Sequence, residues 1–414
     1  MPPLTTPLTL STPRRQAVFY ALLYAGTGAS LPFMPLWLKT HGMSAGQIGI
    51  ILAVPLLLRA LSGPISGLWA DSFRLYRTPL VVLALSGACF YALMSLGALV
   101  PPVRFAAYLV LFTLGYTCMA SVSPLIDAMT LQLSRREHFT YAIPRAVGSS
   151  AFIFANIVLG YLLLVLPSDS ILVWIVVAAT LTAIGGRYLL GDQVRPDIHH
   201  VDTPRQTGWQ RLRVLMRDEG FLWLMIAVGC LQASHSFYYA FSTIIWKERG
   251  LSSGTCGYLW AVGVVAEVAF MWLGEGIRRR MGPWRMLVLA GVFAVVRWGV
   301  MAMSPPLWVL YPLQALHALS FAATYLAGLE LIHRLTPKGY EGLAQTMNAA
   351  YASGVMMGIG TLASGAIYQV FAARGYGVMA TVAGIGLLSA LWMYSQRDRL
   401  MAITPTVPAP GDAG

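Results

Sequence analysis

The chain has 414 residues, of which 57% are hydrophobic and only 11% are charged. A water-soluble globular domain typically carries about 25% charged residues, so this composition excludes an ordinary soluble protein. The net charge of +12 would suit a nucleic-acid-binding protein, but the basic residues gather in short loops between apolar segments. We therefore interpret the chain as an integral membrane protein whose partner is a lipid bilayer and not a nucleic acid.

Apolar segments long enough to cross a bilayer recur along the whole chain. A helix of about 20 apolar residues spans the hydrocarbon core. The polar, proline-containing segment before the first one lacks the apolar core and cleavage site of a signal peptide, so we expect the first helix to remain as an anchor. We expect twelve membrane helices, over residues 16–38, 46–70, 78–99, 104–132, 141–166, 170–190, 219–246, 254–277, 284–304, 307–333, 343–371 and 376–395.

Lys and Arg are distributed unequally between the two sets of loops. The loops on the side of the termini hold most of the 28 basic residues. This bias is typical of cytoplasmic loops, so it predicts a multi-pass protein of a bacterial-type cytoplasmic (inner) membrane with both termini in the cytoplasm. The four cysteines have no paired spacing, and we interpret the adjacent His199 and His200 as solvated loop residues. We expect neither a metal site nor a cofactor.

The longest polar stretch separates six expected membrane helices from six others. We expect an N-terminal six-helix bundle over residues 1–190, a cytoplasmic linker over 191–218, a C-terminal six-helix bundle over 219–400 and a disordered tail over 401–414. The loops after the second and eighth helices begin near Gly67 and Gly274, which are half the chain length apart. The sequence therefore predicts a duplicated six-helix unit.

The first of these two loops carries a motif of a glycine, an acid and two basic residues. Gly67, Asp71, Arg74 and Arg77 resemble the signature loop of major facilitator transporters, although the glycine that usually follows the aspartate is missing. In this interpretation the glycine lets two helices approach closely, while the aspartate caps a helix end and holds an arginine of the opposing bundle. The alternative is that these residues only anchor the topology. The resemblance implies an all-α fold of twelve transmembrane helices in two pseudo-symmetric six-helix bundles.

Ionisable side chains inside the expected membrane helices are the main candidates for a functional site. Each costs about 2.5–3.5 kcal/mol at a helix centre, so a partner, a cavity or a function is expected for it. Asp127 and Arg145 are expected at one depth on neighbouring helices, where an ion pair would either bind solute or only fix the packing. Arg59, Glu267 and Arg297 are expected near the midplane. The internal repeat predicts that Arg59 faces Glu267 from the equivalent helix of the other half.

Two histidines are expected at a depth similar to that of the central charges. His235 and His317 each suit a hydrogen-bonded core position when considered alone. Their common depth beside an acid and an arginine favours a function in solute or proton binding. Aromatic side chains of the same helices can line an apolar cavity for a solute.

Three runs carry a resemblance to one group of transporters: LQASHSFYYAFS at 231–242, GYLWAVGVVAEV at 257–268 and VRWG at 296–299. They resemble the 3-phenylpropionate transporter-like group of the major facilitator superfamily, and the resemblance extends over all twelve expected helices. More distantly, the chain is similar to lactose permease-type proton symporters, in which an acid and an arginine hold the sugar and a second acid, arginine and histidine couple the proton. Residues at matching places are Asp127, Arg145, Glu267, Arg297 and His317.

One position departs from the permease pattern. A carboxylate follows the histidine by three residues in the permeases, and Ser320 stands there in this chain. Glu267 is therefore expected to carry more of the proton coupling, and the sugar specificity is not expected to be shared.

These observations predict a secondary active transporter and not an enzyme. We expect proton-coupled symport of a small organic solute, with an aromatic carboxylate such as 3-phenylpropionate as the substrate, by a monomer. A proton on Glu267 is expected to release Arg297, whose planar fork would then bind the anionic head group. The alternatives are a proton-coupled sugar or nucleoside symporter and an exporter of small organic molecules.

Overall fold

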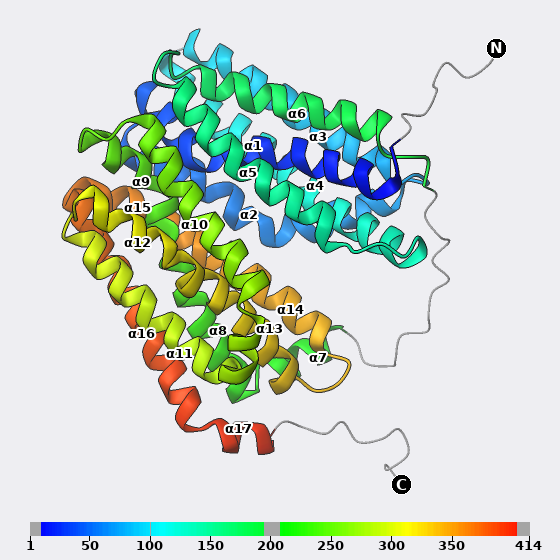
Figure 1. Cartoon of the computed structure of the whole chain (residues 1–414), viewed down its shortest axis with the longest axis vertical. Coiled ribbons are helices and arrows are strands. Elements are labelled where there is room, and N and C mark those ends of the chain that lie inside the picture. The colour runs from blue at the N-terminus through cyan, green and yellow to red at the C-terminus, as the bar shows by residue number, and fades with distance from the viewer. Residues whose placement is uncertain (1–9, 100, 194–207, 404–414) are drawn as a thin grey trace. The chain divides into compact units, whose positions relative to one another are not determined.

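The computed structural model describes residues 10–99, 101–193 and 208–403, which contain helices and no strand. His199 and His200, and residues 404–414 of the expected tail, lie outside this range. Figure 1 shows the helices in chain order from blue to red. The first six are α1 (Thr12–Thr40), α2 (Ala45–Asp71), α3 (Arg77–Met94), α4 (Arg104–Arg136), α5 (Ala142–Leu162) and α6 (Ser170–Tyr188). The others are α7 (Gly208–Leu215), α8 (Glu219–Ala233), α9 (Ser236–Glu248), α10 (Ser253–Leu273), α11 (Glu275–Ala302), α12 (Leu307–Ala315), α13 (Ala323–Leu335), α14 (Glu341–Asn348), α15 (Met357–Phe371), α16 (Tyr376–Ser395) and α17 (Arg397–Ile403).

The described helices are long and apolar enough for repeated membrane crossings. Ten segments qualify, or eleven when α2, bent by 54° near Arg59, is included. The longest segment, Glu341–Ser395, has 55 residues, which is far more than one crossing needs at about 1.5 Å per residue. Its backbone leaves the helical conformation at Ala372, where φ is 46°. This segment therefore contains both of the last two expected membrane helices.

The chain forms two compact units. The first contains the described residues of Met1–Asp197 together with Ser242–Ala261, and the second contains those of Ile198–Phe241 and Val262–Gly414. The division passes through the middle of α9 and through the middle of α10. The second half of α9, the loop after it and the first part of α10 therefore belong to the first unit. The expected bundle boundaries stay a prediction.

The helix ends follow from local sequence signals. Ser44 forms a capping box with Gln47 at the start of α2, which satisfies two of the free backbone N–H groups there. Asp218 accepts a hydrogen bond of 2.6 Å from the backbone N–H of Phe221 at the start of α8, and its burial raises the pKa of this carboxyl. Gly42 has φ of +80° directly after α1, a conformation that ends a helix most easily at glycine.

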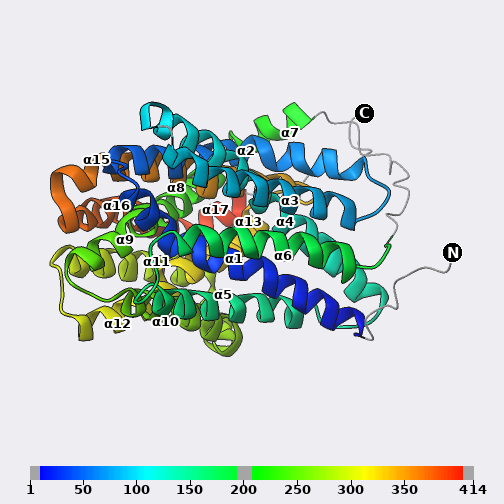
Figure 2. The ribbon, with the colours of Figure 1, turned by 90° about the horizontal axis from the view of Figure 1, so that it is seen from above.

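In the first unit α1 packs against α5 and α6, while α3 packs against α4 and α6. Figure 2 shows α1, α5 and α6 side by side. The core between α1, α3 and α4 is apolar and includes Phe19, Leu80, Val122 and Ile126. These helices hold the tyrosines and charged residues of the first unit at fixed positions.

In the second unit α11 packs against α13 and α16, and α16 packs against α8. Two of its membrane segments contain π-helical turns, at Ala318–Ala322 and Ala349–Met356. Such turns widen the helix and are frequent at functional sites. His317 directly precedes the first π-helical turn, and His235 lies in the break between α8 and α9.

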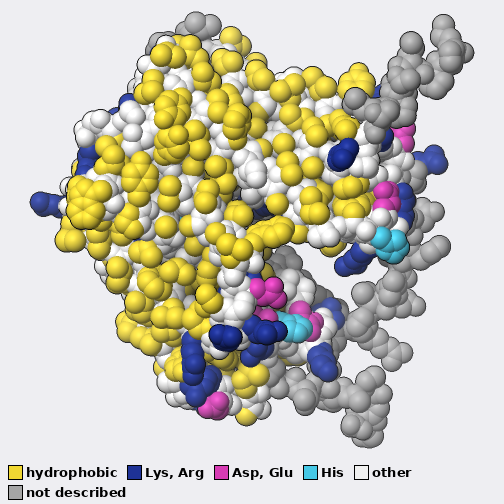
Figure 3. Space-filling model, viewed as in Figure 1, with side chains coloured by type: hydrophobic (Ala, Val, Ile, Leu, Met, Phe, Trp, Pro, Cys, Tyr) yellow, Lys and Arg dark blue, Asp and Glu magenta, His cyan; other side chains and the backbone are white. Residues whose placement is uncertain are grey.

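The surface agrees with a membrane location. Hydrophobic side chains cover most of the visible flanks of the helices, whereas Lys, Arg, Asp and Glu gather mainly toward helix ends (Figure 3). Apolar residues such as Leu61, Val173 and Leu388 are 67%, 60% and 69% exposed. Contact of so many apolar side chains with water would be unfavourable, whereas contact with lipid chains is favourable.

Candidate functional site

A polar cluster in the second unit surrounds a buried guanidinium. Arg297 of α11 is 0% exposed. Its Nη1 atom lies 3.0 Å from Nδ1 of His317 and 3.4 Å from Oγ of Ser320. Its Nη2 atom donates to Oε1 of Gln314 at 3.1 Å. Gln314 belongs to the end of α12, His317 directly precedes the π-helical turn and Ser320 lies within it.

The contact between Arg297 and His317 fixes the proton position on the histidine. A guanidinium only donates hydrogen bonds, so Nδ1 of His317 must be the acceptor. The ring proton is then on Nε2, which lies 3.7 Å from Oε2 of Glu267. His317 is therefore neutral in this arrangement and presents its N–H to the acid. The side chain of Glu267 is 23% exposed, so the acid is the accessible member of the chain Arg297–His317–Glu267.

His235 joins the same cluster from the α8–α9 break. Its Nδ1 atom lies 3.0 Å from the backbone oxygen of Leu231, so this nitrogen is the donor. Its Nε2 atom, 3.2 Å from Oγ of Ser320, is then the acceptor. Ser320 thus connects His235 with Arg297, although the sequence comparison indicated only that Ser320 replaces an acid.

Aromatic rings enclose the guanidinium. The Cζ atom of Arg297 lies 4.3 Å from the ring centre of Trp298 and 4.9 Å from that of Tyr238. The indole N–H of Trp298 donates to Oγ of Ser234 at 2.9 Å. These contacts replace water around a positive charge through cation–π attraction. They also leave no exposed surface on Arg297 for a solute.

The first unit contains a second group of candidate residues, on α1, α4 and α5. Oδ1 of Asp127 accepts hydrogen bonds from the hydroxyls of Tyr20 at 2.6 Å and Tyr141 at 2.9 Å. The guanidinium of Arg145 lies over the ring of Tyr24 at 4.4 Å. The sequence predicted an ion pair between Asp127 and Arg145; among the described residues the two side chains contact tyrosines instead.

Arg59 of α2 lines a cavity of about 270 Å³ in the first unit. The other lining residues include the rings of Tyr24, Tyr91 and Tyr116 and the hydroxyl of Ser123. Arg59 is exposed and is the one charged residue among those that line this cavity. Arg59 and Glu267 belong to different units, so their expected juxtaposition stays a prediction.

The residues of the loop motif lie where α2 ends and α3 begins. Asp71 is the last residue of α2, and Arg74 is exposed in the turn that follows. A Cβ atom at Gly67 would have open space among the described residues, so the expected close helix approach is not seen there. Arg77 forms an ion pair with Asp192 and donates to the backbone oxygen of Arg187 at 3.0 Å. It thereby connects the start of α3 to the end of α6.

Four residues of these clusters, Gln314, Tyr91, Tyr116 and Tyr141, did not stand out in the sequence. Gln314 is 0% exposed and lies three residues before His317, about one helical turn away. This spacing could have identified Gln314 as a neighbour of the histidine. Tyr91 and Tyr116 are two of many aromatic residues in the membrane helices, and no sequence signal distinguished them from packing residues.

The comparison with known families decides the identity of the fold. Residues 14–376 match the family model described as "MFS_1 like family". The chain belongs to this family. It is therefore a multi-pass membrane transporter of small molecules with the major facilitator fold, as the sequence predicted.

Similar proteins of this superfamily are transporters as well. The chain is 33% identical over 383 residues to the Escherichia coli (strain K12) protein named "Probable 3-phenylpropionic acid transporter", covering 91% of this chain and 96% of that protein. The structure of the nucleoside transporter NupG is similar with a TM-score of 0.74 at 15% identity, covering 95% of this chain and 99% of that one. The D-xylose-proton symporter is similar with a TM-score of 0.67 at 14% identity, covering 91% and 95%. These two structures support the fold alone.

Proposed function

We propose that the protein carries an aromatic monocarboxylate across the membrane together with a proton. The observation that carries this proposal is the cavity in which one exposed guanidinium, that of Arg59, lies among three tyrosine rings. The relative named for 3-phenylpropionic acid supports the same class of solute. A phenylalkanoate combines the two groups that such a cavity suits, a carboxylate and an apolar ring.

The chemistry of the cavity suits this solute. An arginine can bind a carboxylate through two parallel hydrogen bonds, and the rings of Tyr24, Tyr91 and Tyr116 can contact an aryl group face to edge. A volume of about 270 Å³ is near the lower end of the range for small-molecule sites. A small solute is therefore favoured over a large one.

Arg59, and not Arg297, is the residue that we assign to the solute carboxylate. Arg297 is 0% exposed, and its N–H groups already bind His317, Ser320 and Gln314. A proton on Glu267 would not free it, because these three partners are neutral and do not depend on the charge of the acid. Arg297 instead serves as a fixed charge beside His317.

We assign the coupling proton to Glu267. Its contact with Nε2 of His317 stabilises the ionised acid, and its partial exposure gives a proton access to it. Protonation changes the combined charge of Arg297, His317 and Glu267 from zero to +1. A transporter that has bound one proton and one carboxylate then carries the same net charge as the empty one. This equality favours movement of proton and anion together.

Uptake into proteoliposomes tests the proposal. Labelled 3-phenylpropionate, a disaccharide and a nucleoside are compared with and without an inward proton gradient. We expect accumulation of the carboxylate alone, and only with the gradient. Unlabelled 3-phenylpropionamide, which has the same ring and no charge, should compete poorly. Gradient-driven accumulation of the sugar or nucleoside, or equal competition by the amide, would contradict it.

We also propose that the protein lies in a bacterial cytoplasmic membrane with both termini in the cytoplasm. The excess of Lys and Arg in the loops on the side of the termini supports this orientation. A reporter that is active only outside the cytoplasm should be inactive when fused after residue 403 and active when inserted after Gly250. The reverse pattern would contradict the orientation.

A further inference from the structure

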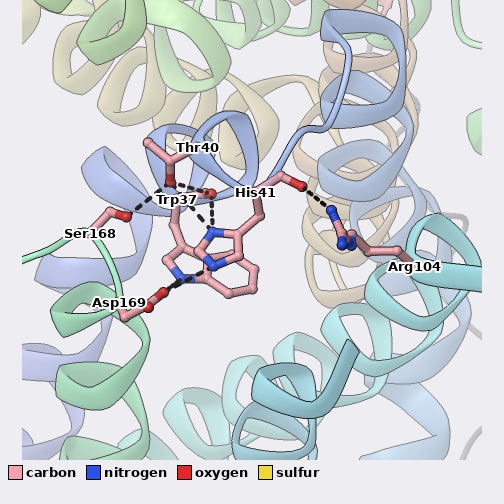
Figure 4. Close-up of polar contacts among 6 residues, drawn as sticks. All are labelled: Trp37, Thr40, His41, Arg104, Ser168 and Asp169. Atoms are coloured by element: carbon pink, nitrogen blue, oxygen red, sulfur yellow. Dashed lines mark hydrogen bonds and ion pairs between the residues drawn. The ribbon is translucent and has the colours of Figure 1, made fainter. Parts of the chain in front are cut away.

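His41, directly after α1, lies between two hydrogen-bond acceptors. Its Nδ1 atom is 2.9 Å from the backbone oxygen of Trp37, and its Nε2 atom is 3.0 Å from Oδ1 of Asp169. Figure 4 shows the imidazole between these two oxygen atoms. A carbonyl and an ionised carboxylate accept hydrogen bonds but cannot donate them, and a neutral imidazole has only one N–H. One of the two contacts therefore requires an additional proton.

We propose that His41 and Asp169 form a proton-binding site, separate from Glu267 and His317, that joins the end of α1 to the start of α6. With the proton bound, both ring nitrogens donate and the pair is an imidazolium and a carboxylate. Without it, a lone pair of the ring faces the negative oxygen, and the connection weakens. This site is independent of the proposed solute and of the coupling role of Glu267.

The two helix ends favour the charged form of the pair. The oxygen of Trp37 belongs to the last turn of α1, where the helix dipole stabilises a positive charge. Asp169 directly precedes α6, where the dipole stabilises a negative charge. The indole N–H of Trp37 also donates to Oδ1 of Asp169 at 3.1 Å, which holds the carboxylate in place.

The pair is accessible from outside the protein. The side chains of His41 and Asp169 are 18% and 66% exposed. Both line a cavity of about 350 Å³, together with Trp37, Ser95 and several aliphatic residues of α6. A proton can therefore reach the site without passing through the helix bundle. Histidine is the side chain that exchanges a proton near neutral pH.

Other charged groups lie near His41, and Asp169 is the one that contacts the imidazole ring. Arg104 of α4 donates to the backbone oxygen of His41, at 3.3 Å. Lys39 on α1 is paired with Glu248 of α9. Tyr108 presents its ring 6.4 Å from the imidazole at a steep angle.

A neutral arrangement with the proton on Nε2 has weaker support. It would need the hydroxyl of Thr40 to donate to Nδ1 of His41, at 3.4 Å. That hydroxyl lies closer to the oxygen of Trp37, at 2.9 Å, and to Oγ of Ser168, at 3.1 Å. In the neutral ring the Nδ1 lone pair would also face the oxygen of Trp37, and the two would repel each other. In the imidazolium Nδ1 carries a proton and donates to this oxygen.

Nuclear magnetic resonance of the full chain in lipid nanodiscs, with ¹⁵N-labelled histidine, tests the protonation state. The signal of His41 is identified by its loss in His41→Gln. With both proteins at the same mildly acidic pH, we expect protons on both ring nitrogens in the wild type and on one nitrogen in Asp169→Asn. A single protonated nitrogen in the wild type, or the same state in both proteins, would overturn the proposal.

Hydrogen exchange tests the mechanical consequence. The backbone N–H groups of Gly42 and Met43 donate to Lys39 and Leu38 at the end of α1. After correction for the intrinsic rate, their protection should fall about tenfold between acidic and alkaline solution, the size expected for one charge-assisted hydrogen bond. In His41→Gln, whose amide can donate to Asp169 without titrating, protection should not depend on pH. Equal pH dependence in both proteins would contradict the site.

Discussion

Nη1 of Arg297 lies 3.0 Å from Nδ1 of His317 in the interior of the second unit, and this contact determines which ring nitrogen holds the proton. Because the guanidinium can only donate, His317 must direct its single N–H toward Glu267. A residue to which we assign no contact with the solute thus decides how the acid is stabilised. The first two predictions follow from this arrangement.

Replacing Glu267 with Gln should abolish accumulation driven by a proton gradient. The amide cannot take up or release the coupling proton but keeps an oxygen that can face Nε2 of His317. Exchange of internal for external solute, which needs no net proton movement, should persist. In proteoliposomes with labelled 3-phenylpropionate, uptake under an imposed proton gradient measures accumulation, and counterflow measures exchange. Wild-type accumulation by Glu267→Gln would show that the coupling proton binds elsewhere.

Transport should respond to the pH gradient and not to the membrane potential. One proton on Glu267 balances one solute carboxylate, so the complete cycle moves no net charge. A potassium diffusion potential imposed with valinomycin at equal internal and external pH should leave the uptake rate unchanged. Stimulation by a negative interior would indicate more than one proton for each solute.

Replacing Arg59 with Lys should raise the KM for the carboxylate about tenfold, because an ammonium cannot make the paired hydrogen bonds of a guanidinium. Arg59→Gln, which loses the charge, should raise the KM for the carboxylate further. Arg74→Lys is a matched control, since Arg74 is an exposed arginine of the turn after α2 and should leave KM unchanged. An unaltered KM in Arg59→Gln would place the carboxylate site elsewhere.

Replacing Gly257 with Ala should destabilise the packing of α10 on α5. A Cβ atom at Gly257 would lie 2.3 Å from the backbone oxygen of Asn156, so the two helices would have to separate. We expect a loss of about 1–3 kcal/mol, measured by thermal unfolding in detergent. Gly299→Ala in α11 is the control, because a Cβ there meets no atom within 4 Å. Equal stability of both variants would refute the close approach.

The fold was predictable because the membrane imposes a simple length and polarity rule on each helix. The last two expected helices, 343–371 and 376–395, lie in one continuous helical segment, Glu341–Ser395, and the expected break between them coincides with the short 3-10 turn Ala372–Gly375. The length rule located this break, because 55 residues are too many for one crossing. It could not locate the breaks beside His235 and His317, because each of these lies within a single expected crossing.

The site was predictable in its members and less so in its contacts. Glu267, Arg297 and His317 stood out because ionisable groups are costly in lipid, and two contacts connect them in the structure. The order of their contacts was not predictable, since it depends on the direction of the His317 side chain, which spacing does not give. Asp127 and Arg145 were expected to bind each other because they have opposite charges and similar depths on neighbouring helices. Tyrosine hydroxyls and ring faces compete with ion pairs, and their directions cannot be derived from spacing.

The complete burial of Arg297 has a consequence for ionic strength. Dissolved salt screens charges that lie within reach of mobile ions, over about 8–10 Å in ordinary buffers, and an enclosed guanidinium is largely shielded from this effect. Arg59, on the wall of an open cavity, is not. Chloride should therefore weaken solute affinity at Arg59 while it leaves the contacts of Arg297 with its buried partners nearly unchanged. Raising the salt concentration distinguishes the two guanidinium groups without altering a single residue.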